Sequence, residues 1–398
     1  MPQFGRPVNW RYQETVLSLA VFANFSQLWT RLLISPLVPS ILVAFGVSKS
    51  FVGLALTGMW AAYALFQYPS GVFGDRFGER RVVLASLGSA AVAVVLLAAS
   101  PSFPLFGVFV VLLGASSGLY YPAASSLLTR LYENTGQALG FHTAGGAFAG
   151  LLAPVVAAAV SVRYGWRAAI LLGVVMLLPA LVLSARYVER TAPMRPDTPL
   201  ADRLDPRRAF GPLSDPALVR TTFLGFVASF AWQSFTSFFP TFLVEFRAFS
   251  TGRASVVFGA VMVISVVSLP ILGRLSDRFP RDLTLAGALT VGGAGIAVFL
   301  LGGGLPATVA GVALAGIGFG WGGVLHSLFM DYLPTAERAS GFGLVRTVYM
   351  LVGSLGSVIT GSLADTVGWP AAYGFVVLLL AAGVALILGQ RVASGSGG

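Results

Sequence analysis

Twelve long apolar runs, separated by short polar loops, limit what this chain can fold into. Each run has the ~20 mostly apolar residues that a helix needs to cross a bilayer. Backbone groups find no hydrogen-bond partner in hydrocarbon, so each run must be helical, and its continuous apolar character argues against barrel strands, which alternate. The predicted spans are 14–44, 51–73, 82–100, 104–129, 137–161, 167–188, 218–244, 254–274, 283–303, 305–330, 340–363 and 370–389.

The chain has too few charges to cover a surface that faces water. Charged residues make up 10% of its 398 residues, against about 25% in soluble domains, and the mean hydropathy is +0.83. The lipid bilayer is therefore the expected solvent and partner. The net charge of +10 does not indicate nucleic acid, because the arginines lie in short loops without a continuous basic face. With no cysteine and two histidines, neither a disulfide, a metal site nor a cofactor is expected.

A short polar motif occurs twice, about half a chain apart. The first copy is Gly71-Val72-Phe73-Gly74-Asp75-Arg76-Phe77, and the second, 202 positions later, is Gly273-Arg274-Leu275-Ser276-Asp277-Arg278-Phe279. Further pairs share nearly this offset: Gly114 and Gly118 with Gly316 and Gly320, Gly165-Trp166 with Gly368-Trp369, and Pro39 with Pro240. Such a repeat predicts two halves of equal topology, related by a pseudo-twofold axis along the membrane normal.

A polar stretch rich in proline and arginine separates the two halves. We therefore predict an N-terminal six-helix bundle over 1–188, a cytoplasmic linker over 189–217, a C-terminal six-helix bundle over 218–390 and a disordered tail over 391–398. The first apolar run has no small-residue cleavage site at its end, so it is interpreted as a retained helix rather than a signal peptide.

The distribution of basic residues predicts the orientation in the membrane. If the loop that contains Asp75 is cytoplasmic, eighteen lysines and arginines lie on that side and five on the other. Cytoplasmic loops carry the excess of basic residues, so both termini are predicted to be cytoplasmic. We expect a multi-pass protein of the plasma membrane, monomeric and without a nucleic-acid partner.

The loop between the second and third spans resembles the signature loop of the major facilitator superfamily. The resemblance covers the whole chain, and it rests on the twelve spans, the central linker and the pattern Gly71-x-x-x-Asp75-Arg76-x-Gly78-x-Arg80-Arg81 with its echo at 273–281. The chain departs from the pattern at Glu79, where the family usually has a basic residue, and Pro280 replaces the second glycine of the echo. The resemblance implies an all-α membrane protein of two pseudo-symmetric six-helix bundles.

The same resemblance implies a gating role for the signature loop. Asp75 is an anion at a helix end and suits the positive N-terminus of another helix, which the resemblance implies is the eleventh, beginning near Ala339. The loop arginines can pair with acids at neighbouring helix ends, with Glu133 as the candidate, or they only set the topology. The predicted gating residues are Gly71, Asp75, Arg76, Gly78, Arg80, Arg81, Glu133, Gly273, Asp277 and Arg278.

Two arginines fall inside predicted spans. A central arginine such as Arg31 costs ~2.5–3.5 kcal/mol to insert, so it should face a cavity or a partner. Because first helices of the superfamily line the central cavity, Arg31 is predicted to anchor a carboxylate or phosphate; the alternative is a structural role near Pro36 and Pro39. Arg346 is predicted to reach Asp331 or Glu337 near the interface, with cavity lining as its alternative.

Several polar and aromatic side chains are suited to lining a substrate cavity, although such residues also hold helices together. The full predicted substrate-binding set is Arg31, Asn24, Gln27, Tyr63, Gln67, Trp232, Gln233, His326 and Arg346. His142 and His326 are the only histidines, and either could carry a proton near neutral pH. No Asp or Glu lies deep in a predicted span, so uniport, exchange or histidine-linked coupling remain open.

These features predict a transporter that works by alternating access on a small solute, with a small organic anion as the favoured substrate. The alternative is an exporter of lipophilic or drug-like compounds, and a membrane sensor or embedded enzyme is a more distant one. Catalysis is not expected, because the hydrolase-like pattern Gly114-x-Ser116-x-Gly118 lies within a span and not at a strand–turn–helix junction.

Overall fold

The computed structural model describes residues 10–197, 215–333 and 338–395. In its N-terminal half the helices are α1 (Trp10–Leu32), α2 (Ile34–Phe45), α3 (Lys49–Phe77), α4 (Glu79–Ala98), α5 (Phe103–Gly118), α6 (Tyr120–Leu131) and α7 (Thr135–Tyr187). The pairs α1–α2 and α5–α6 each form one membrane crossing with a local break. The 53-residue α7 is two crossings, because Gly165 interrupts it with φ 82° and ψ 163°. Glycine tolerates this conformation at little cost.

The C-terminal half repeats this arrangement. Its helices are α10 (Pro216–Glu245), α11 (Thr251–Arg278), α12 (Arg281–Leu301), α13 (Gly304–Gly318), the 3₁₀ turn η2 (Phe319–Trp321), α14 (Gly322–Tyr332), α15 (Arg338–Gly353), α16 (Leu355–Thr366) and α17 (Trp369–Gly395). Ten helical stretches of the described chain are long and apolar enough to cross a membrane, and Gly165 divides one of them, α7, into two. The described residues therefore form an all-α protein with eleven such crossings, and the 30-residue α10 is long enough to be the twelfth.

The C-terminal bundle extends beyond its predicted limits at both ends. α10 begins at Pro216, with the carboxylate of Asp215 accepting a hydrogen bond from the backbone N–H of Ala217 at 2.8 Å. α17 continues to Gly395, beyond residue 390 where the second bundle was predicted to end. Most of the predicted linker, 198–214, lies outside the described residues, so the domain division stays a prediction.

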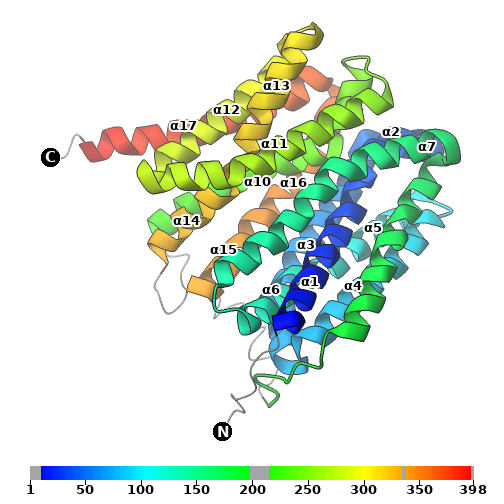
Figure 1. Ribbon diagram of the computed structural model, residues 1–398. Coiled ribbons are helices and arrows are strands. Elements are labelled where there is room, and N and C mark those ends of the chain that lie inside the picture. Colours follow the sequence, from blue (N-terminus) through cyan, green and yellow to red (C-terminus); the bar gives the residue numbers. More distant parts are fainter. Residues whose placement is uncertain (1–9, 198–214, 334–337, 396–398) are drawn as a thin grey trace.

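The two bundles meet along a seam of helices from both halves (Figure 1). α3 packs against α15 and α16, the first crossing of α7 packs against α11, and α2 packs against α10. Small residues allow this close approach: a Cβ on Gly53 would lie 2.6 Å from the carbonyl oxygen of Ser357, and one on Gly259 would lie 2.9 Å from that of Leu151. The seam is therefore closely packed at these two points.

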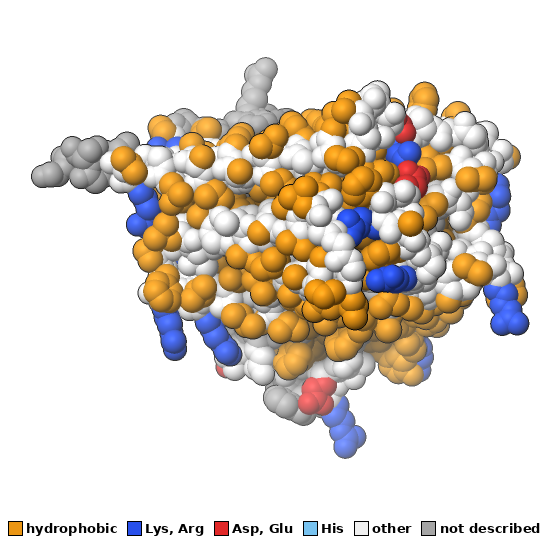
Figure 2. All heavy atoms as spheres, turned by 90° about the horizontal axis from the view of Figure 1, so that it is seen from above, with side chains coloured by type: hydrophobic (Ala, Val, Ile, Leu, Met, Phe, Trp, Pro, Cys, Tyr) orange, Lys and Arg blue, Asp and Glu red, His pale blue; other side chains and the backbone are white. Residues whose placement is uncertain are grey.

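The outer surface is largely apolar. Hydrophobic side chains cover much of the face shown in Figure 2, and residues such as Val43 and Leu301 are more than four-fifths exposed. A surface of this kind is stable against lipid tails rather than water, as the composition predicted.

Candidate functional site

Arg31 lies in the last turns of α1 and points into the protein. Only 8% of the residue is exposed, and its guanidinium carbon lies 4.2 Å from the ring centre of Tyr63 and 5.2 Å from that of Trp60, both on α3. Its Nε donates to the carbonyl oxygen of Gln27 at 3.4 Å. In the described part of the chain no carboxylate forms an ion pair with it. Arg31 is therefore a buried cation held by aromatic faces.

Arg346, on α15 of the other half, lies close to the same group. Its guanidinium carbon is 5.5 Å from the ring centre of Tyr121, and it interacts electrostatically with Tyr63, Tyr349 and Arg31. The predicted contact of Arg346 with Asp331 is wrong, because Asp331 pairs with Arg281 instead. Glu337, the other predicted partner, lies outside the described residues.

Arg31 thus lies over Tyr63, while Arg346 of the other half lies over Tyr121 and interacts electrostatically with Tyr63 and Arg31. No ion pair between Arg346 and a described carboxylate balances the second charge either. Like charges in a low-dielectric interior repel each other, and no described carboxylate offsets this repulsion.

His326 and Gln67 belong to the same region. His326 on α14 is exposed, its ring centre lies 4.2 Å from that of Phe342, and it interacts electrostatically with Arg346. Gln67 on α3 donates from Nε2 to the sulfur of Met350 on α15 at 3.6 Å, which links the two halves. Of the predicted residues, Arg31 and Tyr63 are thus in contact, and Arg346 interacts electrostatically with both and with His326.

Two residues of the predicted substrate-binding set, Gln27 and Asn24, form hydrogen bonds within the N-terminal bundle. The amide of Gln27 donates to Ser86 Oγ at 3.0 Å and accepts from Ser117 Oγ at 2.8 Å, and the residue is only 1% exposed. Asn24 Nδ2 donates to the carbonyl oxygen of His142 at 2.8 Å. These amides have partners on α4, α5 and α7 and hold α1 in place within two turns of Arg31, and their role in substrate binding stays a prediction.

The predicted residues on α10 do not join the arginine pair in any described contact. Trp232 is partly exposed, and its ring centre lies 5.6 Å from that of Phe319 in an edge-to-face arrangement. Gln233 is fully buried, and neither of its amide atoms has a hydrogen-bond partner among the described residues. Their substrate roles stay predictions.

Sequence reasoning missed three aromatic residues that surround the arginines: Trp60, Tyr121 and Tyr349. A signal existed for two of them. Trp60 precedes Tyr63 by three positions and Tyr349 follows Arg346 by three, and residues three apart share a helix face. Tyr121 had no such signal, because its closeness to Arg346 depends on the contact between the halves.

A polar cluster that we name the outer latch joins four helices at the end opposite to residues 10 and 395. It consists of Lys49, Ser50, Glu245, Asp365 and Trp369. Lys49 Nζ lies 3.1 Å from Glu245 and 3.6 Å from Asp365, while Ser50 donates to Asp365 from its N–H at 2.7 Å and from its hydroxyl at 2.6 Å. Trp369 Nε1 donates to Glu245 at 3.0 Å. The latch therefore fastens α3 to α10, α16 and α17.

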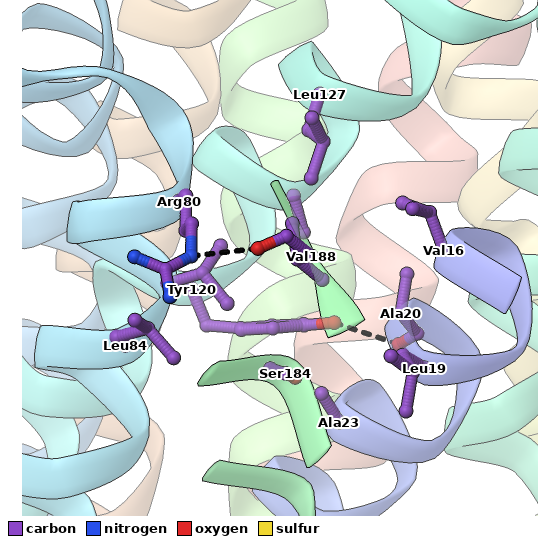
Figure 3. A pocket seen from close by; sticks show the side chains of 12 residues that line it. Val16, Leu19, Ala20, Ala23, Arg80, Leu84, Tyr120, Leu127, Ser184 and Val188 are labelled. Carbon is purple, nitrogen blue, oxygen red and sulfur yellow. Dashed lines mark hydrogen bonds between the residues drawn. The ribbon is translucent and has the colours of Figure 1, made fainter. Parts of the chain in front are cut away.

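One of the three signature-loop arginines, Arg80, caps a helix within its own half, and the predicted gating role of the loop stays a prediction. At the end of α7, Arg80 donates from Nε to the carbonyl oxygen of Val188 at 2.7 Å (Figure 3). Its Nη2 donates to the carbonyl oxygen of Ala185, also at 2.7 Å. A cation is favoured at the C-terminus of a helix. The expected pair of Arg80 with Glu133 is not formed, and Glu133 is exposed.

Glu79, which departs from the family pattern, is compensated locally. Its side chain is fully buried, and it accepts hydrogen bonds from Arg130 Nη1 at 2.8 and 2.9 Å and from Ser126 Oγ at 3.2 Å. This ion pair between the buried Glu79 and the exposed Arg130 ties the start of α4 to α6. Removal of one partner would leave an uncompensated charge.

The remaining gating residues stay predictions. Gly78 turns the chain with φ 85°, and a Cβ there would collide with Thr191, whereas a Cβ on Gly71 or Gly273 would meet open space. The carbonyl oxygen of Asp75 accepts from the N–H of Arg195 at 2.9 Å. The predicted contact near Ala339 involves side chains outside those described. Arg76 is half-buried, whereas Arg81, Asp277 and Arg278 are exposed.

The comparison with known families agrees with this architecture. The sequence profile of the Major Facilitator Superfamily matches residues 17–357. This chain belongs to the major facilitator superfamily. It is therefore a membrane-spanning transporter of that superfamily, and the resemblance inferred from the signature loop is confirmed.

Individual members of the superfamily resemble the chain at moderate identity. Multidrug resistance protein MdtG of Citrobacter koseri is 27% identical over 72% of this chain and 71% of its own length. The human voltage-gated purine nucleotide uniporter SLC17A9 is 26% identical over 87% of this chain and 85% of its own length. The structure of a bacterial homologue of the human lysosomal transporter Spinster, inward-facing and occupied, aligns with a TM-score of 0.79 at 17% identity, over 96% of this chain and 98% of that one.

Proposed function

We propose that this facilitator-superfamily protein carries small organic anions by alternating access, with the substrate held between Arg31 and Arg346. One observation carries the proposal: two guanidinium groups from opposite halves, Arg31 over Tyr63 and Arg346 over Tyr121, interact electrostatically, and no described carboxylate pairs with either. A carboxylate or phosphate oxygen accepts charge-assisted hydrogen bonds from arginine in a fork geometry. An anion that bridges the halves couples its own binding to their relative movement.

The outer latch indicates which conformation this is. The halves are fastened on the side of Lys49, and the contact continues at Thr57, whose hydroxyl donates to the carbonyl oxygen of Ser354 at 2.9 Å and accepts from the N–H of Val358 at 3.1 Å. With both termini in the cytoplasm of a plasma-membrane protein, as predicted, the closed end faces outward. Transport then requires Lys49 to separate from Asp365 and Glu245 while the opposite ends approach.

The similarity to multidrug resistance protein MdtG favours a second candidate function, the export of lipophilic compounds. The contact of Trp232 with Phe319 could line an apolar route of this kind. In that case, Arg31 would be dispensable for substrate binding. The burial of Arg31 without an acidic partner among the described residues supports an anionic substrate instead.

A binding and uptake panel separates the two candidates. The purified protein is tested by thermal shift and in proteoliposomes with benzoate, lactate and methyl phosphate as anions, and with tetraphenylphosphonium as a lipophilic cation. We expect stabilisation and uptake with at least one anion, and their loss in Arg31→Gln and Arg346→Gln. Arg253→Gln, which removes an exposed arginine stacked on Phe249, is the control. Uptake of the lipophilic cation alone, unchanged in Arg31→Gln, would refute anion transport.

A further inference from the structure

An apolar pocket lies between α1, α4, α6 and the second crossing of α7, at the end where Arg80 caps α7 (Figure 3). Its empty volume, with the open mouth included, is about 340 Å³. Arg80, Tyr120 and Ser184 are its polar lining residues. The other nine are apolar and come from all four helices: Val16, Leu19, Ala20, Ala23, Val83, Leu84, Ala124, Leu127 and Val188. No residue of the proposed anion site lines this pocket.

The lining of the pocket suits a hydrocarbon chain better than water. Ordered water needs two to four polar partners. The hydroxyl of Tyr120 already donates to the carbonyl oxygen of Ala20 at 2.6 Å and lies 3.3 Å from His142 Nε2, so it is occupied (Figure 3). An acyl chain needs no hydrogen bond, and it gains van der Waals contacts with the apolar lining.

The mouth of the pocket lies beside lipid-exposed parts of the protein. Among the lining residues only Leu19, Arg80 and Leu84 are half-exposed, and the other nine are buried. The adjoining residues of α7, Val182 and Leu183, are exposed and apolar. A lipid with two chains can therefore insert one chain into the pocket and keep the other along α7 in the bilayer.

The mouth carries an excess of positive charge. Nε and Nη2 of Arg80 are used by the carbonyl oxygens of Val188 and Ala185, whereas Nη1 donates to no described residue. Glu189 is the exposed acid beside these groups, and Glu79 is buried and paired with Arg130. Three more exposed arginines lie within two residues of Arg80 or of its carbonyl partners: Arg81, Arg186 and Arg190.

We propose that this pocket binds an anionic phospholipid, with one acyl chain between α1, α4 and α7 and the phosphate at Arg80. A phosphate oxygen accepts a charge-assisted hydrogen bond from Nη1 and leaves both carbonyl contacts of Arg80 in place. Basic pockets between membrane helices on the cytoplasmic side bind anionic head groups, and both the charge and the predicted orientation fit that pattern. A zwitterionic lipid fits less well, because its choline cation meets the same arginines.

The test measures lipid binding by native mass spectrometry of the full chain in dodecyl maltoside. Phosphatidylglycerol and phosphatidylcholine with the same acyl chains are titrated separately. We expect the unmodified protein to bind phosphatidylglycerol at least about tenfold more tightly, because each nearby arginine favours an anionic lipid. Arg80→Gln should lower its affinity for phosphatidylglycerol by about tenfold, since a charge-assisted hydrogen bond is lost.

Two further variants separate the pocket from the surface charge. Ala124→Leu extends a side chain into the pocket and keeps every arginine, so it should also weaken phosphatidylglycerol binding, by about tenfold or more. Arg220→Gln removes an exposed arginine on α10 of the other half and is the control, with affinity expected to stay within about twofold. If Arg80→Gln does not fold, Ala124→Leu decides alone, because it keeps the cap of α7.

Three outcomes would overturn the lipid site. Unchanged phosphatidylglycerol affinity in Ala124→Leu would show that the arginines attract the lipid only at the surface. Equal affinity for the two lipids would remove the role of charge. Displacement of phosphatidylglycerol by equimolar glycerol 3-phosphate would assign the arginines to a free phosphate ester. No transport substrate is present in this experiment, so its result is independent of the proposed anion transport.

Discussion

The first helices of the two halves, α1 and α10, occupy equivalent positions in the repeat but have different surroundings. In α1, Asn24 and Gln27 bond to α4, α5 and α7, and Arg31 follows one turn later. In α10, Phe235 and Phe239 stack at 4.0 Å between ring centres, and Phe239 meets Phe299 of α12 edge to face at 4.8 Å. Amide hydrogen bonds hold α1 in its bundle, whereas α10 is held by stacked rings together with the hydroxyls of Ser234 and Ser237, which bond to α16.

This difference in surroundings fits the presence of a buried arginine on α1 and not on α10. Arg31 precedes Trp232 by 201 positions, the offset that relates Pro39 to Pro240, so the repeat places an arginine in one half and an indole in the other. A buried cation needs a polar scaffold that is itself fully hydrogen-bonded. α1 has one, whereas α10 leaves both amide atoms of Gln233 without a partner among the described residues. The two halves thus share their helix order but differ in the side chains that pack around their first helices.

The largest expected effect is on anion affinity, which should fall when Arg31 is changed but not when its counterpart on α10, Trp232, is changed. Arg31→Gln removes charged hydrogen bonds to the substrate, each of which contributes about 1.5–3 kcal/mol, so anion affinity should fall on the order of 100-fold. Trp232→Phe, which keeps a ring against Phe319, should change it by less than about threefold. Isothermal titration with the best-binding anion measures both. Equal losses in the two variants would show that the halves share the anion equally.

Truncation in the aromatic core should destabilise the fold more than it affects substrate affinity. Phe239→Ala leaves a cavity among Phe235, Phe258 and Phe299, and buried Phe→Ala changes cost about 3–5 kcal/mol in soluble proteins. Unfolding in mixed micelles should show this loss, with anion affinity unchanged in the folded fraction. A large loss of affinity without a loss of stability would contradict the assignment of this core to packing.

A change in the polar scaffold of α1, unlike one in the aromatic core, should weaken anion affinity as well as stability. Gln27→Leu leaves Ser86 and Ser117 without their side-chain partner, although Ser86 keeps its bond to the carbonyl oxygen of Ser116. Such unsatisfied groups cost about 1–3 kcal/mol. Because Arg31 lies one turn away, anion affinity should also weaken, by roughly tenfold. Thr15→Val, which removes a hydroxyl that bonds only within α1, is the control. Unaltered affinity in Gln27→Leu would show that the scaffold does not position Arg31.

The smallest effect should come from the outer latch. Its ion pairs are partly exposed, and such pairs contribute about 1 kcal/mol or less. Lys49→Gln should therefore shift the balance between inward- and outward-facing states by no more than about fivefold. Because the chain has no cysteine, a single Thr57→Cys probe can report this opening through faster alkylation from outside. Arg253→Gln should leave the rate unchanged. A slower rate in Lys49→Gln would contradict the latch.

The requirements of the lipid bilayer explain most of the structural features that could be predicted from the sequence. Lipid requires helices of membrane length, so the number of spans and the all-α fold followed from the apolar runs, and the repeat motif indicated two equivalent halves. The free-energy cost of a charge in hydrocarbon also predicted correctly that Arg31 points into the protein, because a guanidinium that faced the lipid tails would be less stable.

The tertiary structure decided which polar groups remain available. Gln27 and Arg346 both looked like polar residues in apolar spans, but α4 and α5 satisfy the amide of Gln27, while Arg346 meets Tyr121 across the seam. The outer latch and the position of His142 under Tyr121 likewise depend on which helices become neighbours. Hydrogen bonds and ion pairs act over a few ångströms, and a linear pattern does not record distances between separate helices.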